Sequence, residues 1–115
     1  MRLAYVDSAI GMMRTVVTAE KRFAEMHPNR GYACAFSDLA STEPSLELSG
    51  RSQRNGYAFE LICPSRNGGD ANEHFQVTAR PLEKDLPAYC SDQSGIVRYD
   101  EGGSPAGCLL NGSTL

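Results

Sequence analysis

The sequence predicts an α+β fold in which one long N-terminal α-helix packs on a small antiparallel β-sheet of three to four strands, stabilised by disulfides. Three observations lead to this fold class. Residues 3–26 repeat apolar side chains at helical spacing. Residues 56–63 and 73–81 alternate between apolar and polar side chains, as strands do. The chain of 115 residues also contains an even number of cysteines, 4.

Composition predicts a single domain over residues 1–115. With 41% hydrophobic residues, the chain can bury one modest core but not two. The formal net charge is -3, and the Lys and Arg residues are scattered rather than interleaved with aromatic residues as in a nucleic-acid groove. We therefore predict no nucleic-acid partner.

The N-terminal helix is expected over residues 1–28. Its apolar pattern runs from Leu3 to Met26, and Pro28 followed by Gly31 supplies a breaker and a glycine at its end. No Ser, Thr, Asp or Asn precedes the first apolar residue as a cap, so we expect an upstream segment to be missing here. No stretch approaches the roughly 20 apolar residues of a transmembrane helix, and no signal peptide is recognisable.

The apolar arc of this helix spans roughly half of the cylinder, which is wider than one sheet can cover. Because about 24 residues make roughly 36 Å of helix, the N-terminal half should protrude beyond the short strands. The stripe that is left over should contact neighbouring subunits; a helix sunk deeply in its own core is the alternative. The predicted assembly interface is Leu3, Val6, Ile10, Met13 and Val17, and the second stripe is Ala9, Met12, Val16, Ala19, Phe23 and Met26.

Glu20 falls inside the apolar arc beside Phe23. A buried carboxylate must be paired or hydrogen-bonded. We favour a position at the shallow edge of the arc, where the carboxylate reaches water or an arginine. The alternative is an orienting contact to the loop after the helix.

The rest of the chain is expected to form a connecting loop over residues 29–55, with one short helical turn near residues 36–39. An antiparallel sheet should follow over residues 56–100. Its strands are residues 56–63, 73–81 and 95–99, and the first two are separated by the turn-forming residues 64–72. Residues 101–115 are expected to be a C-terminal loop pinned only by Cys108.

The four cysteines, Cys34, Cys63, Cys90 and Cys108, contain no CxxC pair of the redox or zinc-binding kind. Two disulfides are predicted, and three connectivities are possible. The sequential pairing of Cys34 with Cys63 and Cys90 with Cys108 is favoured because each closes a local segment beside a turn-rich stretch. Such a chain needs an oxidising compartment. Four buried thiols in a cytosolic protein are the alternative.

Enzymatic activity is not predicted. The only histidines, His27 and His74, lie at a helix end and in a strand, with no catalytic motif around either. Hard oxygen ligands suited to calcium occur at Asp92, Asp100 and Glu101, and also at Asp70, Asn72 and Glu73, but neither group has the spacing of a known calcium loop. We predict no catalytic residue, no metal ligand and no cofactor.

Residues 9–20 (AIGMMRTVVTAE), Phe23 and residues 31–34 (GYAC) resemble bacterial type IV pilin-like proteins and type II secretion pseudopilins. Residues 89–99 (YCSDQSGIVRY) resemble the last strand region of the same group. The resemblance implies a pilin-like exported head anchored in the inner membrane through a preceding hydrophobic segment. The glycine-phenylalanine cleavage motif and the glutamate near the mature N-terminus of that family have no counterpart in this sequence.

The predicted function is therefore that of a structural subunit of a type IV pilus or type II secretion pseudopilus, acting by helix-mediated self-association into a fibre. Its expected location is the periplasmic face of the inner membrane or an extracellular fibre. A DNA-uptake fibre is a further possibility within the same class. The alternative is a free, disulfide-stabilised periplasmic or extracellular ligand-binding domain. A fibre subunit should expose the stripe that contains Leu3, Val6, Ile10 and Met13.

Overall fold

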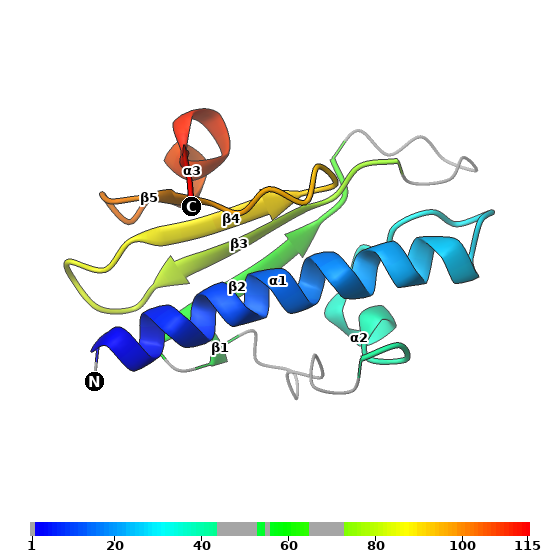
Figure 1. Ribbon diagram of the computed structural model, residues 1–115, viewed down its shortest axis with the longest axis horizontal. Coiled ribbons are helices and arrows are strands. Elements are labelled where there is room, and N and C mark those ends of the chain that lie inside the picture. The colour runs from blue at the N-terminus through cyan, green and yellow to red at the C-terminus, as the bar shows by residue number, and fades with distance from the viewer. Residues whose placement is uncertain (1, 44–52, 55, 65–72) are drawn as a thin grey trace.

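The computed structural model describes residues 2–43, 53–54, 56–64 and 73–115. A long N-terminal helix crosses one face of an antiparallel sheet, and a short helix near the C-terminus lies on the other face (Figure 1). The elements are α1 (Arg2–Met26), α2 (Phe36–Leu39), β1 (Gln53–Arg54), β2 (Tyr57–Ile62), β3 (Gln76–Pro81), β4 (Ala88–Asp92), β5 (Arg98–Asp100), α3 (Pro105–Asn111) and β6 (Ser113–Thr114). The predicted α+β class, with a long N-terminal helix on an antiparallel sheet, is confirmed.

The sheet is a meander in which every strand pairs antiparallel with its neighbours in sequence. Within the described part of the chain it has 6 strands, so the prediction of three to four was too low. β1 and β6 are only 2 residues long, too short to show an alternating pattern. The predicted strand at residues 95–99 begins later, at Arg98.

β4 was not predicted as a strand, and its burial explains why. Ala88, Tyr89, Cys90 and Ser91 are all buried, because this strand lies between β3 and β5 and is covered by α1 on one face and α3 on the other. A strand that is buried on both faces has no polar side to alternate with its apolar side. The sequence of this segment therefore lacks the period of two on which the prediction of β2 and β3 depended.

Residues 101–115 are not a loop as predicted, because they contain α3 and β6. Ser104 caps α3: its Oγ accepts a hydrogen bond from the backbone N–H of Gly107 at 3.0 Å. Pro105 occupies the first turn, where its missing N–H has no cost. The disulfide at Cys108 then fastens this short helix to β4.

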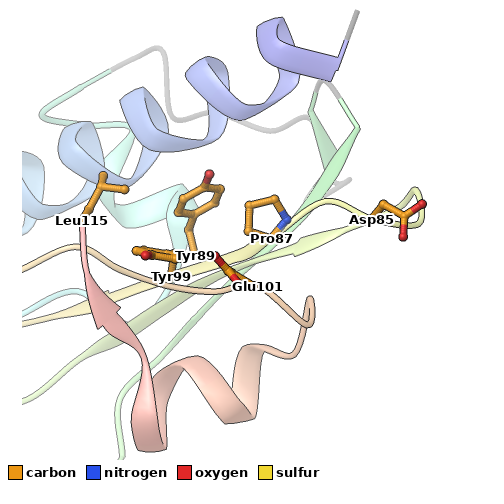
Figure 2. Close-up of a pocket in the computed structure, with 6 residues that line it drawn as sticks. All are labelled: Asp85, Pro87, Tyr89, Tyr99, Glu101 and Leu115. Atoms are coloured by element: carbon orange, nitrogen blue, oxygen red, sulfur yellow. The ribbon is translucent and has the colours of Figure 1, made fainter.

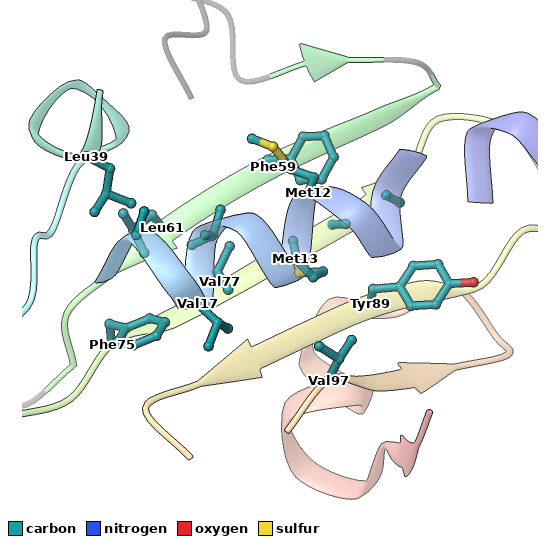
Figure 3. Packing of buried hydrophobic residues seen from close by; sticks show 14 of the residues in the cluster. Met12, Met13, Val17, Leu39, Phe59, Leu61, Phe75, Val77, Tyr89 and Val97 are labelled. Atoms are coloured by element: carbon teal, nitrogen blue, oxygen red, sulfur yellow. The ribbon is translucent and has the colours of Figure 1, made fainter. Parts of the chain in front are cut away.

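The hydrophobic core fills the space between α1 and the sheet (Figure 3). The register pairs Phe59 with Ala79 and Leu61 with Val77, so these four side chains share the face toward the helix. The other large buried side chains of this core are Met13, Val16, Phe23, Leu39, Tyr57 and Phe75.

Gly56, in the turn before β2, should be sensitive to substitution. Its φ is +80°, and a Cβ at this position would lie 2.6 Å from Cδ2 of Tyr5 on α1. Gly56→Ala should therefore lower the free energy of unfolding by at least about 2 kcal/mol. Gly11→Ala is the matched control, since no atom lies within 4 Å of its Cβ position and helical Ala is favoured over Gly by up to about 1 kcal/mol. Urea unfolding of both variants checks the difference; equal stabilities would contradict this assignment.

Candidate functional site

The predicted assembly stripe on α1 is divided between the core and the surface. Met13 is fully buried and Val17 is 6% exposed, so both side chains belong to the core of this chain and not to an exposed stripe. The segment between β4 and β5 covers this side of the helix: a Cβ at Gly95 would lie 3.8 Å from Cγ1 of Val17. The helix is sunk more deeply in its own core than the stripe prediction allowed.

Val6 and Ile10 are half-buried and pack against the core cluster from its edge. The side chain of Leu3 lies outside the described part of the structure. The predicted interface therefore offers no continuous apolar stripe among the residues whose side chains are described.

The exposed surface of α1 instead carries a line of residues at alternating spacings of 3 and 4, the spacing of one face of a packed helix. We call this line the outer line of α1. Small residues alternate along it with charged ones, and the stripe prediction missed it because it is not apolar. Its exposed members are Ala4, Asp7, Gly11, Arg14, Thr18, Lys21 and Glu25.

Glu20 does not lie at the edge of the apolar arc, as we had favoured, but is fully buried. Its Oε1 accepts a hydrogen bond from the backbone N–H of Ala33 at 2.6 Å, which is the alternative contact to the loop after the helix. Its Oε2 is buried and has no hydrogen-bond partner among the described residues. Burial raises the pKa of Glu20 to about 8, against the lowering effect of the Ala33 hydrogen bond, and Asp38 adds to the rise. The side chain is thus mainly protonated at neutral pH.

Two disulfides join the cysteines in the sequential pairing that was favoured, Cys34 with Cys63 and Cys90 with Cys108. The Cα atoms are 5.3 Å and 6.0 Å apart, within the range for such bridges. The first ties the segment after α1 to the end of β2, and the second ties α3 to β4. Neither includes a residue of α1.

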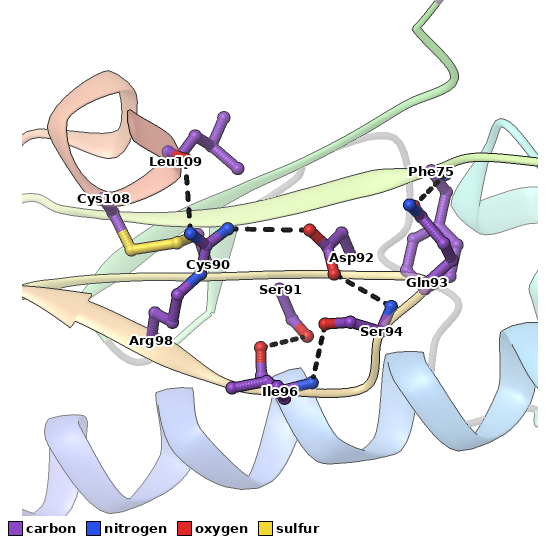
Figure 4. Close-up of polar contacts among 10 residues, drawn as sticks. All are labelled: Phe75, Cys90, Ser91, Asp92, Gln93, Ser94, Ile96, Arg98, Cys108 and Leu109. Carbon is purple, nitrogen blue, oxygen red and sulfur yellow. Dashed lines mark hydrogen bonds and ion pairs between the residues drawn. A yellow bond between two sulfur atoms is a disulfide. The ribbon is translucent and has the colours of Figure 1, made fainter. Parts of the chain in front are cut away.

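Two of the acids considered as calcium ligands, Asp92 and Asp100, form polar contacts within the fold. Figure 4 shows the network of Asp92 beside the second disulfide. Asp92 pairs with Arg98 at 3.6 Å and accepts from the backbone N–H of Ser94 at 2.9 Å. Arg98 also donates to the carbonyl of Leu109 in α3 at 3.3 Å. Asp100 accepts from the backbone N–H of Ser104 at 2.9 Å. These contacts assign both carboxylates to turn and cap formation.

A cavity of about 400 Å³ opens on the α1 face of the sheet, beside β4, β5 and the end of the chain after β6. We call it the Tyr89–Tyr99 cavity, after two tyrosines that are directly paired across β4 and β5. Leu115 and Asp85 lie toward its two ends in Figure 2, with the tyrosines between them. It is lined by Asp85, Pro87, Tyr89, Tyr99, Glu101 and Leu115. Of these, only Glu101 was considered in the sequence analysis, as a calcium ligand. The cavity itself was not predicted, since Tyr89 and Tyr99 meet only through a strand that the pattern did not show.

The described residues contain no group of three or more His, Cys, Asp or Glu side chains placed to hold a metal ion. His27 lies with its ring centroid 4.4 Å from that of Phe23, and His74 is exposed. Asp70 and Asn72 lie outside the described residues. None of the described helices is both long enough and apolar enough to cross a membrane.

Neither a protein-family model, a curated protein sequence nor a solved structure matches this chain. The candidate sites are therefore the outer line of α1 and the Tyr89–Tyr99 cavity, each judged by its own chemistry.

Proposed function

We propose that this chain is a structural subunit that associates with further copies through α1 to form a fibre of the type IV pilus or type II secretion pseudopilus kind. The observation that carries the proposal is the outer line of α1, which leaves one side of a 25-residue helix exposed while the other side is in the core. The resemblance of residues 9–34 and 89–99 to pilin-like proteins supports the same class of function.

Small residues on the outer line favour close approach of a second helix. Ala4, Gly11 and Thr18 follow one another at intervals of seven residues and are all exposed. A Cβ at Gly11 would have no neighbour within 4 Å, so the backbone there is open to an approaching chain. Helices pack at axis separations of about 8–10 Å, and small contact residues favour the lower end of that range.

The outer line carries charges of both signs, so a staggered arrangement of two helices can pair opposite charges. Asp7 is acidic, whereas Arg14 and Lys21, one and two heptads further along, are basic. A parallel neighbour displaced by seven residues, or about 10.5 Å along the axis, places Asp7 of one copy beside Arg14 of the other. The same displacement places small residues beside small residues and brings Arg14 of the first copy to Lys21 of the second. Each copy then uses two different parts of the same line, and a contact of this heterologous kind extends into an open polymer rather than closing a dimer.

The two disulfides support a location outside the cytosol for the assembled protein. Bridges of this kind persist in the periplasm or at the cell surface and are rare in reducing compartments. Anchoring in the inner membrane through an upstream hydrophobic segment belongs to the same proposal and rests on the family resemblance.

Cysteine cross-linking in the full-length protein, produced in the bacterial periplasm, tests the proposed contact. In the staggered arrangement, residue 11 of one copy faces residue 18 of the next, so the double variant G11C/T18C should give a ladder of oligomers under mild oxidation. The double variant E60C/E83C, which changes two exposed residues away from α1, is the matched control. Equal cross-linking of the two variants would contradict the proposal.

Charge reversal then tests the stagger itself. Asp7→Arg should reduce the G11C/T18C ladder, because it places like charges at residues 7 and 14 of neighbouring copies. The combined reversal, Asp7→Arg with Arg14→Asp, should restore the ladder, since opposite charges again lie side by side. A ladder that responds neither to Asp7→Arg nor to the combined reversal would exclude this register of the two helices.

A free ligand-binding domain is the second candidate function, and the Tyr89–Tyr99 cavity is the observation that favours it. Such a domain should remain monomeric in analytical ultracentrifugation at all concentrations and should show no ladder in the cross-linking experiment. The same measurements therefore separate the two functions.

A further inference from the structure

The charged side chains around the Tyr89–Tyr99 cavity are all of one sign. Asp85 and Glu101 line it, and no Lys, Arg or His is among its six lining residues. Asp7 on α1 adds a third carboxylate near Tyr89. Burial has the largest effect in raising the pKa of the Tyr89 phenol, and Asp7 and Tyr99 raise it further. A concave surface lined by charges of one sign concentrates their negative potential. The potential favours a cation.

The aromatic side chains supply a second feature of cation recognition. Tyr89 and Tyr99 occupy directly opposed positions on adjacent strands, so both rings face the α1 side of the sheet. Ring faces attract ammonium and guanidinium groups through the aromatic quadrupole, and the attraction grows when the site is desolvated. An alkali metal ion would not need these rings, whereas an organic cation uses both them and the carboxylates.

The side chain of Tyr89 is only 3% exposed and lines the cavity. The hydroxyl of Tyr57, the other buried tyrosine, is used within the fold, where it donates to the carbonyl of Pro87 at 2.7 Å. A phenol oxygen can accept a hydrogen bond as well as donate one, so the Tyr89 hydroxyl can accept from an ammonium or guanidinium N–H inside the cavity.

We propose that the Tyr89–Tyr99 cavity binds an organic cation, an alkylammonium or guanidinium group, between the tyrosine rings and the carboxylates of Asp85 and Glu101. The volume of about 400 Å³ accommodates such a group together with its alkyl chain. The cation can be a free small molecule or the Lys or Arg side chain of another protein copy. The proposal does not rest on fibre assembly and holds for a free domain as well.

Aromatic NMR of the protein with ¹³C-labelled tyrosine tests the proposal directly. Titration with tetramethylammonium chloride should shift the ring signals of Tyr89 and Tyr99 in a saturable way, with the signals of Tyr32 unmoved. tert-Butanol, a neutral molecule of similar shape, and sodium chloride at equal ionic strength are the reference titrations. Equal shifts with tert-butanol or with sodium chloride, or no saturable shift with the cation, would overturn the proposal.

Variants separate the contributions of charge and ring. Glu101→Gln should weaken binding roughly threefold to tenfold. Glu60→Gln removes the same charge from an exposed position on β2 and should leave the affinity unchanged. Tyr99→Leu should weaken binding by at least about threefold, whereas Tyr99→Phe should retain it because the ring face remains. Equal affinities of the Glu101→Gln and Glu60→Gln variants would contradict the assigned role of Glu101 whether or not the tyrosine variants fold.

A competition titration and a dilution series distinguish the source of the cation. N-acetyl-arginine amide and tetramethylammonium should compete for the same ring signals. If the natural ligand is a side chain of a second copy, dilution of the protein alone should also move the Tyr89 and Tyr99 signals toward their ligand-free positions. If it is a free molecule, dilution should leave them unchanged while tetramethylammonium still binds. Tetramethylammonium binding without cross-linking at α1 would reject the fibre and keep the cavity assignment.

Discussion

Removal of both disulfides by the four substitutions C34S, C63S, C90S and C108S should leave the chain unfolded at 37 °C. The bridges span sequence separations of 29 and 18, and loops of this size each contribute about 3–4 kcal/mol in the chain-entropy model. A domain of this length has a total stability of roughly 5–15 kcal/mol, so the combined loss consumes most of it. Urea unfolding followed by circular dichroism measures the effect.

The single pairs provide the controls for this experiment. C34S/C63S and C90S/C108S should each shift the unfolding midpoint to lower urea while the chain still folds at 25 °C. Thiol titration of the denatured, non-reduced parent protein should find no free thiol. If the variant with all four substitutions were as stable as the parent, the bridges would contribute nothing to stability.

Glu20→Gln should remove a strong dependence of stability on pH. The pKa of Glu20 is raised from 4.5 to about 8 in the folded chain, so the folded state holds this proton more tightly than the unfolded state. The stability that the folded chain gains by holding this proton is complete below pH 4.5 and is lost as the pH rises toward 8. Within that window the loss is at most about 1.4 kcal/mol per pH unit. The amide of Gln does not titrate and can still accept from the Ala33 N–H.

Urea unfolding of parent and variant at pH 5 and pH 9 measures this effect. The two proteins should differ by no more than about 1 kcal/mol at pH 5, where Glu20 is neutral in the folded chain. At pH 9 the variant should be the more stable by several kcal/mol, because only the parent then buries a charged carboxylate. Glu25→Gln, at an exposed position of the same helix, should follow the parent at both pH values. A pH profile of Glu20→Gln identical to that of the parent would disprove this account.

The elements that could be predicted from the sequence are those whose apolar and polar side chains recur with a regular period. α1 and β2 show a period in their side chains because one side of each contacts the core and the other contacts water. β3 was predictable because the polar Thr78 alternates with Val77 and Ala79 in the sequence, although Thr78 is itself buried. β4 could not be predicted in this way, since α1 and α3 bury both of its faces. The cysteine pairing was predictable because each bridge closes a short local segment.

The candidate sites were predicted less well, for a related reason. A helical wheel shows that Met13 and Val17 are on an apolar arc, but it does not show that the segment between β4 and β5 packs over that arc. The outer line of α1 carries charged and small residues, so a search for an apolar interface passes over it. Tyr89 and Tyr99 become neighbours only through the register of β4 and β5. A search for aromatic pairs across a predicted hairpin at residues 88–100 would have found them.

The placement of the disulfides determines how the chain would respond to mechanical tension. A pull between its two ends passes from Cys34 directly to Cys63 and from Cys90 directly to Cys108, so the residues inside each bridged segment carry no load. α1 lies outside both segments and is held to the sheet only by non-covalent packing. Under force, α1, β3 and β6 would bear the load, because all three lie outside the bridged segments.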